Sequence, residues 1–214
     1  MKLHPNQRRT WANIDLDAAK HNYHEIRNHL KPCTKLCCVV KANGYGHGAI
    51  WLSRMYEKLG ADYLAVSNIE EALQLRYAGI KIPILILGYT DPHCVKELAH
   101  NEITQCVFSY DYGMALSKNA TEEKADIKIH IKIDTGMGRI GFRCVPEELD
   151  VAAMVCMAPG ITVGGIFTHF ASADEGDDGR GYTLAQFHQF SDAVRYLEAK
   201  GIAFPIRHCS NSAG

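Results

Sequence analysis

Short apolar runs that alternate with longer amphipathic stretches constrain the fold of this 214-residue chain more than any other feature. The apolar runs predict strands at residues 36–40, 63–66, 82–87, 104–109, 127–133, 163–168 and 205–208. The amphipathic stretches predict helices at residues 50–59, 69–77, 92–97, 112–117, 146–157 and 185–200, with a further helix at 17–30 before the first strand. This alternation is typical of a parallel sheet with right-handed crossovers.

The number of predicted strands indicates how such a sheet is arranged. Seven strands without an early reversal favour a (β/α) barrel over an open doubly wound sheet, although periodicity alone separates the two poorly. No linker interrupts the series, so residues 1–214 are expected to form one domain. A complete barrel takes about 250 residues. We therefore expect an α/β fold of the (β/α)8 TIM-barrel type, truncated after the seventh strand.

Composition and charge narrow the class of partner. The chain is 47% hydrophobic and 22% charged, as in an ordinary soluble globular protein. Its net charge is −1, from 23 basic and 24 acidic residues, and no long run carries one sign. This pattern argues against nucleic acid or an anionic membrane as the partner and favours a small-molecule substrate.

Other local patterns indicate the cellular location of the protein and the redox state of its cysteines. No apolar stretch approaches the roughly 18 residues that a membrane span requires. The polar start, residues 1–9, lacks the apolar core of a secretory signal, so we expect a cytoplasmic protein. The cysteines show no paired metal-ligand spacing, and we interpret them as reduced structural thiols and predict no metal site. There are eight: Cys33, Cys37, Cys38, Cys94, Cys106, Cys144, Cys156 and Cys209.

Lys41 is the first candidate for chemistry. It ends the apolar run at 36–40 and precedes a glycine-rich turn that carries Tyr45 and His47. An amine at the mouth of a buried strand has its charged form disfavoured, which lowers its pKa and makes it a better nucleophile. Such a lysine suits Schiff-base formation. The spacing is equally compatible with a strand that reaches the surface at a solvated lysine.

Further polar residues follow the later predicted strands, where barrel enzymes place their chemistry. The glycines of residues 134–141 predict a tight turn that holds Arg139, whose planar donors can address an anion. His169 and His208 each close a strand, and residues 210–214 offer hydroxyl and backbone donors for a phosphate. Each feature also has an ordinary interpretation as a surface turn, a structural histidine or a plain loop. Residues 174–178 are predicted to form a solvated acidic loop.

Four motifs together resemble the N-terminal barrel domain of the alanine racemase family. They are Val40-Lys41-Ala42-Asn43-Gly44-Tyr45-Gly46-His47-Gly48, Asp134-Thr135-Gly136-Met137-Gly138-Arg139, Thr168-His169-Phe170-Ala171 and Asn211-Ser212-Ala213. They stand in the family's order, and residues 10–16 are similar to its opening segment. The resemblance covers essentially the whole chain.

The resemblance implies a fold-type III enzyme that uses pyridoxal 5′-phosphate (PLP) to interconvert L- and D-alanine, with D-alanine serving bacterial peptidoglycan. It implies that Lys41 forms the internal aldimine and then acts as the base on one face of the substrate. Tyr45 would hydrogen-bond the cofactor phosphate, together with Ser212 and its neighbour Asn211. Arg139 would donate toward the cofactor phenolic oxygen or the substrate carboxylate.

The same resemblance implies that His169 lines the cofactor ring and that Lys132 is the lysine that many family members carry as a carbamate, orienting the arginine. In the family the second base is a tyrosine from the C-terminal β domain of the partner subunit of a homodimer, and an arginine of the eighth strand bonds the pyridine nitrogen. We therefore expect this chain alone to be a fragment that binds cofactor weakly and is a poor racemase.

Three other functions remain open at this stage. A stand-alone PLP-binding barrel, similar to PLP homeostasis proteins and without racemase activity, explains the length of the chain without truncation. A related decarboxylase shares the barrel. A serine racemase or a mixed serine and alanine racemase differs in substrate by one hydroxyl, which the polarity of the pocket discriminates.

Overall fold

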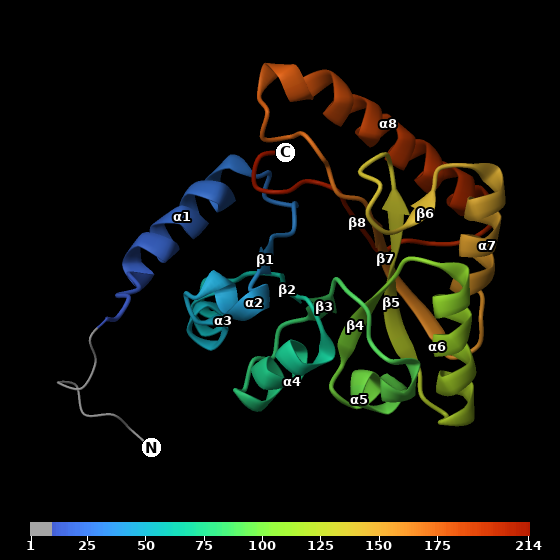
Figure 1. The fold of residues 1–214 in the computed structure, drawn as a ribbon, viewed down its shortest axis with the longest axis horizontal. Coiled ribbons are helices and arrows are strands. Elements are labelled where there is room, and N and C mark those ends of the chain that lie inside the picture. The colour runs from blue at the N-terminus through green and yellow to red at the C-terminus, as the bar shows by residue number, and fades with distance from the viewer. Residues whose placement is uncertain (1–9) are drawn as a thin grey trace.

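A computed structural model describes residues 10–214, so the polar segment 1–9 considered above lies outside the described part (Figure 1). The strands are β1 (Cys37–Val39), β2 (Tyr63–Val66), β3 (Ile84–Ile86), β4 (Ile103–Val107), β5 (Ile127–Asp134), β6 (Phe142–Arg143), β7 (Ile161–Phe167) and β8 (Ile206–His208). The helices are α1 (Leu16–His29), α2 (Lys41–Tyr45), α3 (Ala49–Lys58), α4 (Ile69–Tyr77), the 3₁₀ turn η2 (Pro92–Cys94), α5 (Val95–His100), α6 (Tyr110–Glu122), α7 (Pro146–Cys156) and α8 (Asp177–Ala199).

The sheet is parallel throughout and follows the chain. Its strands lie in the order β1-β2-β3-β4-β5-β7-β8, and β6 pairs only with the end of β5. The register between β5 and β7 shifts between Ile129 and His130. Within the described residues no pairing joins β1 to β8, so the sheet is a part-barrel that is open between these two strands. The α/β parallel architecture predicted from the periodicity is confirmed.

Most predicted elements lie within a few residues of those observed, and the main differences have physical causes. The predicted helix 92–97 is a 3₁₀ turn that starts at Pro92 and continues as α5. Helix α8 begins at Asp177, eight residues before the predicted start at 185, so the predicted acidic loop ends inside a helix. Asp177 and Asp178 occupy the first turn of α8, where carboxylates interact favourably with the helix dipole.

The two faces of β5 divide its residues by chemistry. Ile127, Ile129, Ile131 and Ile133 are fully buried and belong to the hydrophobic core between the sheet and the helices. Because side chains alternate along a strand, Lys128, His130 and Lys132 lie on the opposite, inner face of the barrel. The core that stabilises the fold is therefore outside the sheet, and the inner face carries polar groups.

The helices cover the outer face of the sheet, and α8 runs along one edge of the molecule in Figure 1. On the far side, α1 packs on α3 through Tyr23, whose ring lies 5.8 Å from that of Tyr56. No helix among residues 10–214 has the length and apolar character needed to cross a membrane. All eight cysteines lie in this part and are free; Cys106 and Cys156 are buried.

Candidate functional site

Lys41 stands at the carboxyl end of β1, one residue beyond Val40, which is buried in the outer core. Lys41 is the first residue of α2, which begins where the backbone leaves the extended conformation at Val40, with φ −122° and ψ 14°. Its side chain is half-buried. This position agrees with the predicted place of Lys41 at the barrel mouth, although its burial is only partial.

The glycine-rich turn predicted after Lys41 has a left-handed backbone. Ala42, Asn43, Gly44 and Tyr45 have φ angles of 51°, 54°, 59° and 52°. Left-handed helical backbone costs about 1–2 kcal/mol for each non-glycine residue. The surrounding contacts compensate for this strain, since Asn43 Oδ1 accepts a 2.9 Å hydrogen bond from the Ala49 amide. Strain of this kind is concentrated at functional sites.

Glu71 on α4 fixes the start of the same turn. Its Oε1 accepts a 2.7 Å hydrogen bond from the Ala42 amide, and its Oε2 accepts from the amide and hydroxyl of Ser67 at 2.8 and 3.1 Å. One carboxylate thus joins the loop after β1 to the loop after β2. This link holds the backbone amide that directly follows Lys41.

The turn that carries Arg139 is organised by Asp134 at the end of β5. Asp134 Oδ1 accepts hydrogen bonds from the amides of Gly136 and Gly138, each at 3.0 Å. Gly141 closes the turn with a φ of 131°, and a Cβ there would lie 2.7 Å from the Asp134 nitrogen. The predicted tight turn is therefore present, and the Arg139 side chain is exposed on it.

Lys132 is buried on the inner face beside this turn, with 4% of its surface exposed. Its Nζ donates a 2.9 Å hydrogen bond to the Ile133 carbonyl and lies 5.3 Å from the centroid of the Phe167 ring. Burial lowers the pKa of this ammonium to about 8, with opposing contributions from Cys106 and Asp134. Such an amine is partly neutral, and so nucleophilic, at mildly alkaline pH.

His169 follows β7, and several candidate residues influence its pKa. Its imidazole is half-buried, and its pKa is lowered by burial first and then by the positive charges of Arg139, Lys132 and Lys41. Three cations from two strand ends, Lys41 after β1 and Lys132 and Arg139 at β5, therefore act on one histidine. Oδ1 of the Asp134 carboxylate accepts hydrogen bonds from backbone amides of the Arg139 turn. This excess of positive charge and donors fits an anionic, phosphate-bearing cofactor with an aldehyde that a lysine can hold.

The remaining predicted residues lie at the mouth of the barrel or below it. Tyr45 is 72% exposed, and Ser212 is exposed; within residues 10–214 neither side chain has a hydrogen-bond partner. Asn211 is half-buried, donates from Nδ2 to the Phe170 carbonyl at 3.5 Å and accepts from the Ala213 amide at 3.1 Å. His208 does not join the mouth, because it pairs with His130 on the inner face.

Two residues that bind the site together were missed by sequence reasoning. Glu71 gives no local signal, because an acidic residue in the first turn of a helix is ordinary. Gln186, in contrast, does give a local signal in the sequence. It lies four residues before Phe190 and seven before Ala193, on the apolar face of α8, and a polar residue at such a position indicates a buried polar network.

The fold and the site define a (β/α) part-barrel domain. Two lysines, an arginine and a histidine lie at or near the carboxyl ends of its strands. A family model described as "Alanine racemase, N-terminal domain" matches residues 14–214. The chain therefore belongs to the alanine racemase family, as the four motifs predicted.

Individual relatives agree with this assignment. An alanine racemase from Desulfovibrio desulfuricans is 46% identical over 207 residues, which cover 96% of this chain and 55% of that protein. Alanine racemase from Clostridium difficile 630 superposes with a TM-score of 0.87 at 38% identity, over 94% of this chain and 52% of that one. The Bacillus anthracis enzyme with bound L-Ala-P gives a TM-score of 0.87 at 34% identity, over 94% and 51%. This chain thus spans about half the length of these relatives.

Proposed function

We propose that the protein interconverts L- and D-alanine with PLP, and that residues 10–214 supply the cofactor-binding barrel. The observation that carries this proposal is that Lys41, Arg139 and His169 follow the carboxyl ends of strands of one parallel sheet, with Lys132 buried on β5 beside them. Family membership supports it, and so does the Bacillus anthracis relative, which was solved with L-Ala-P bound. Serine differs from alanine by one hydroxyl, so serine belongs in any test of substrate preference.

In this proposal each residue of the site has a distinct task. Bound PLP supplies the conjugated system that delocalises the electrons left when the α-proton is removed. Lys41 holds the cofactor and moves the α-proton on one face of the substrate. Tyr45, Asn211 and Ser212 donate to the phosphate. Arg139 donates toward a cofactor oxygen or the substrate carboxylate, and His169 lines the ring.

Lys132 acts indirectly, as a carbamate that orients Arg139. The neutral Nζ attacks the carbon of CO2, and a C–N bond forms as one C=O π bond opens and its electron pair moves to oxygen. The nitrogen then loses one proton to solvent, which leaves the carbamate anion. The buried amine, with its pKa lowered to about 8, supports this modification. The product replaces a cation by an anion beside the Arg139 turn, which favours an ordered guanidinium.

Racemisation requires proton transfer on both faces of the α-carbon, and one lysine serves only one of them. We propose that the whole protein is a cytoplasmic homodimer in which a second base completes the site. We expect the 214-residue chain by itself to bind PLP weakly and to racemise alanine poorly.

Reductive trapping tests the proposal directly. The purified chain is incubated with PLP and reduced with borohydride, and the modified lysine is located by peptide mass mapping. We expect modification at Lys41, its loss in Lys41→Arg and its retention in the control Lys128→Arg. Failure to modify Lys41 in a demonstrably folded sample would overturn the proposal. Unreduced portions of the same preparations are given L-alanine or L-serine and analysed by chiral chromatography, and fast turnover would refute the need for a second base.

A further inference from the structure

Gln186 is a fully buried amide on a helix that otherwise presents apolar groups to the sheet. It is 0% exposed, and it shares the inner face of α8 with Phe190, Ala193 and Leu197. Burying an amide among such residues is costly unless its donors and acceptor are used. The contacts of Gln186 therefore indicate why a glutamine lies here.

The hydrogen bonds of Gln186 join the two strand ends that carry the site. Its Oε1 accepts from the Ala171 amide at 2.9 Å, and its Nε2 donates to the His169 carbonyl at 3.3 Å. The same Nε2 donates to Thr135 Oγ1 at 3.1 Å. His169 and Ala171 follow β7, whereas Thr135 lies in the turn that leads from β5 to Arg139. One side chain thus bonds to both segments.

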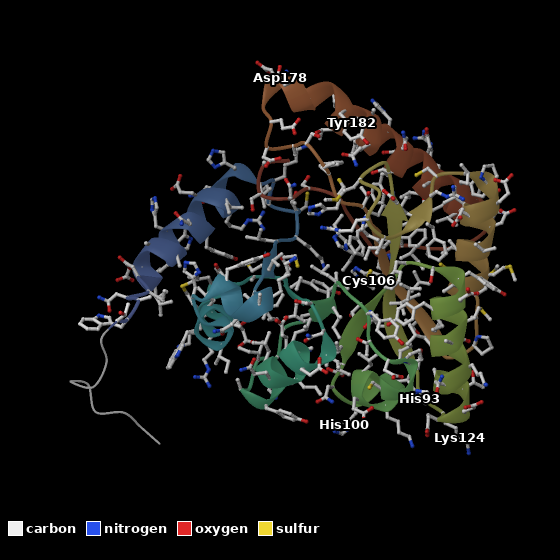
Figure 2. All side chains as sticks on the ribbon, viewed as in Figure 1. His93, His100, Cys106, Lys124, Asp178 and Tyr182 are labelled. Carbon is white, nitrogen blue, oxygen red and sulfur yellow. The ribbon has the colours of Figure 1, made fainter. Side chains whose placement is uncertain are left out.

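Neighbouring contacts reinforce this bridge. The hydroxyls of Thr135 and Thr168 lie 2.8 Å apart, and both residues are buried. Tyr182, one turn before Gln186 and labelled on α8 in Figure 2, donates a 2.8 Å hydrogen bond to the Gly136 carbonyl. A Cβ at Gly136 would lie 2.5 Å from the Tyr182 hydroxyl oxygen, so the helix and the turn are in close contact.

We propose that Gln186 is a positioning residue that sets the place of Arg139 relative to His169, with α8 acting as a clamp across the ends of β5 and β7. Arg139 is exposed, so its place depends on the backbone of its turn, from which the side chain extends. Thr135 and Gly136 are the points at which α8 holds that backbone. This inference rests on the proposed function, because it concerns how the cofactor site is held in shape.

The test compares Gln186→Met with two control variants of α8. Methionine keeps the length and helix propensity of glutamine and removes its amide. Gln189→Met makes the same chemical change at an exposed position of the helix. Phe190→Leu loosens the packing of α8 without removing any bond to the strand ends. The two readouts are hydrogen exchange by segment and the PLP concentration needed for half-maximal borohydride trapping at Lys41.

We expect Gln186→Met to speed exchange at residues 135–141 and 168–172 together, while residues 63–86 stay unchanged. We also expect the half-maximal PLP concentration to rise about tenfold, from the loss of roughly one net hydrogen bond's stabilisation of the site. Gln189→Met and Phe190→Leu should leave that concentration within about twofold. Thr135→Val, which keeps the shape of threonine, should speed exchange in both segments if Gln186→Met does not fold.

Three results would overturn the inference: exchange that rises evenly over the chain, exchange that rises in only one of the two segments, or a PLP requirement that Phe190→Leu raises equally. Absence of Lys41 trapping in the unsubstituted chain would instead contradict the proposed function. In that case hydrogen exchange alone still shows whether Gln186 couples the two strand ends.

Discussion

His130 on β5 and His208 on β8 form a hydrogen bond on the inner face of the barrel, with His130 Nδ1 3.0 Å from His208 Nε2. In this bond one nitrogen donates and the other accepts, so two fully protonated rings cannot form it. Burial is the main cause that lowers the pKa of His130 to about 3 and that of His208 to about 4. The ring of Phe167 stacks on His208 at 4.6 Å. The pair therefore joins β8 to the sheet in a neutral state.

The histidine pair predicts a loss of stability in mild acid. An unfolded histidine has a pKa near 6.5, whereas the folded pair resists protonation down to about pH 4 and 3. The unfolded chain thus binds more protons below pH 6.5, and the free energy of unfolding decreases as pH falls. The limiting slope is about 1.4 kcal/mol per pH unit for each histidine. Urea titrations between pH 7.5 and 4.5 measure it.

Non-titrating substitutions isolate the contribution of the pair. The double variant H130N/H208Q keeps polar atoms near the two bonded nitrogens, and we expect it to flatten the pH dependence. His100→Gln removes an exposed histidine, labelled in Figure 2, and should leave the slope unchanged. An equally steep slope in the double variant would mean that other groups cause the acid sensitivity.

We expect a substitution at Gly44, inside the left-handed turn, to destabilise the fold. A Cβ at this position would lie 2.8 Å from Leu52 Cδ1, and the φ of 59° disfavours any larger residue. Gly44→Ala should lower the free energy of unfolding by about 1–3 kcal/mol, from backbone strain and from displacement of Leu52. Denaturant midpoints give the value. Gly46 has a φ of 92°, but no atom lies within 4 Å of an added Cβ. Gly46→Ala therefore measures backbone strain alone and should lower the free energy of unfolding by less than Gly44→Ala does.

The hydrogen bonds of Glu71 lead us to expect that α4 stabilises the turn after Lys41. Glu71→Ala leaves the amides of Ala42 and Ser67 without their charged acceptor, which should cost about 1–3 kcal/mol. Trapping of PLP at Lys41 should weaken in parallel, because the turn loses its anchor. Glu70→Ala removes an exposed carboxylate from the same first helical turn and controls for the helix dipole. Equal effects of the two variants would assign the loss to the dipole.

We expect the carbamylation of Lys132 to depend on pH. Because burial lowers the pKa of Lys132 to about 8, its neutral form increases through that pH and should react with CO2. Carbon-13 NMR of the chain in labelled bicarbonate should show a carbamate signal that strengthens as pH rises toward and above 8. The signal should vanish in Lys132→Ala and persist in Lys128→Ala. A signal present in both variants would place the carbamate on another amine.

Much of the fold could be predicted because its signals are local. The isoleucines of β5 recur at every second residue, which identifies a strand with one buried face. The small strand β6 and the early start of α8 escaped prediction. Two residues give no periodicity, and an acidic stretch is as typical of a loop as of a helix start. The site roles of Lys41, Arg139 and His169 were predicted from the strand ends and the family motifs and stay predictions.

Hydrophobic periodicity and motif spacing are properties of short segments, so the order of the strands and helices, their parallel arrangement and the family could be predicted. Which polar groups meet depends on how distant segments pack together. Gln186 reaches both Thr135 and His169, and His130 meets His208, through contacts between segments far apart in the chain. Such pairs depend on strand register, on the β5–β7 shift and on the backbone angles of the loops, and these are set when the whole sheet assembles.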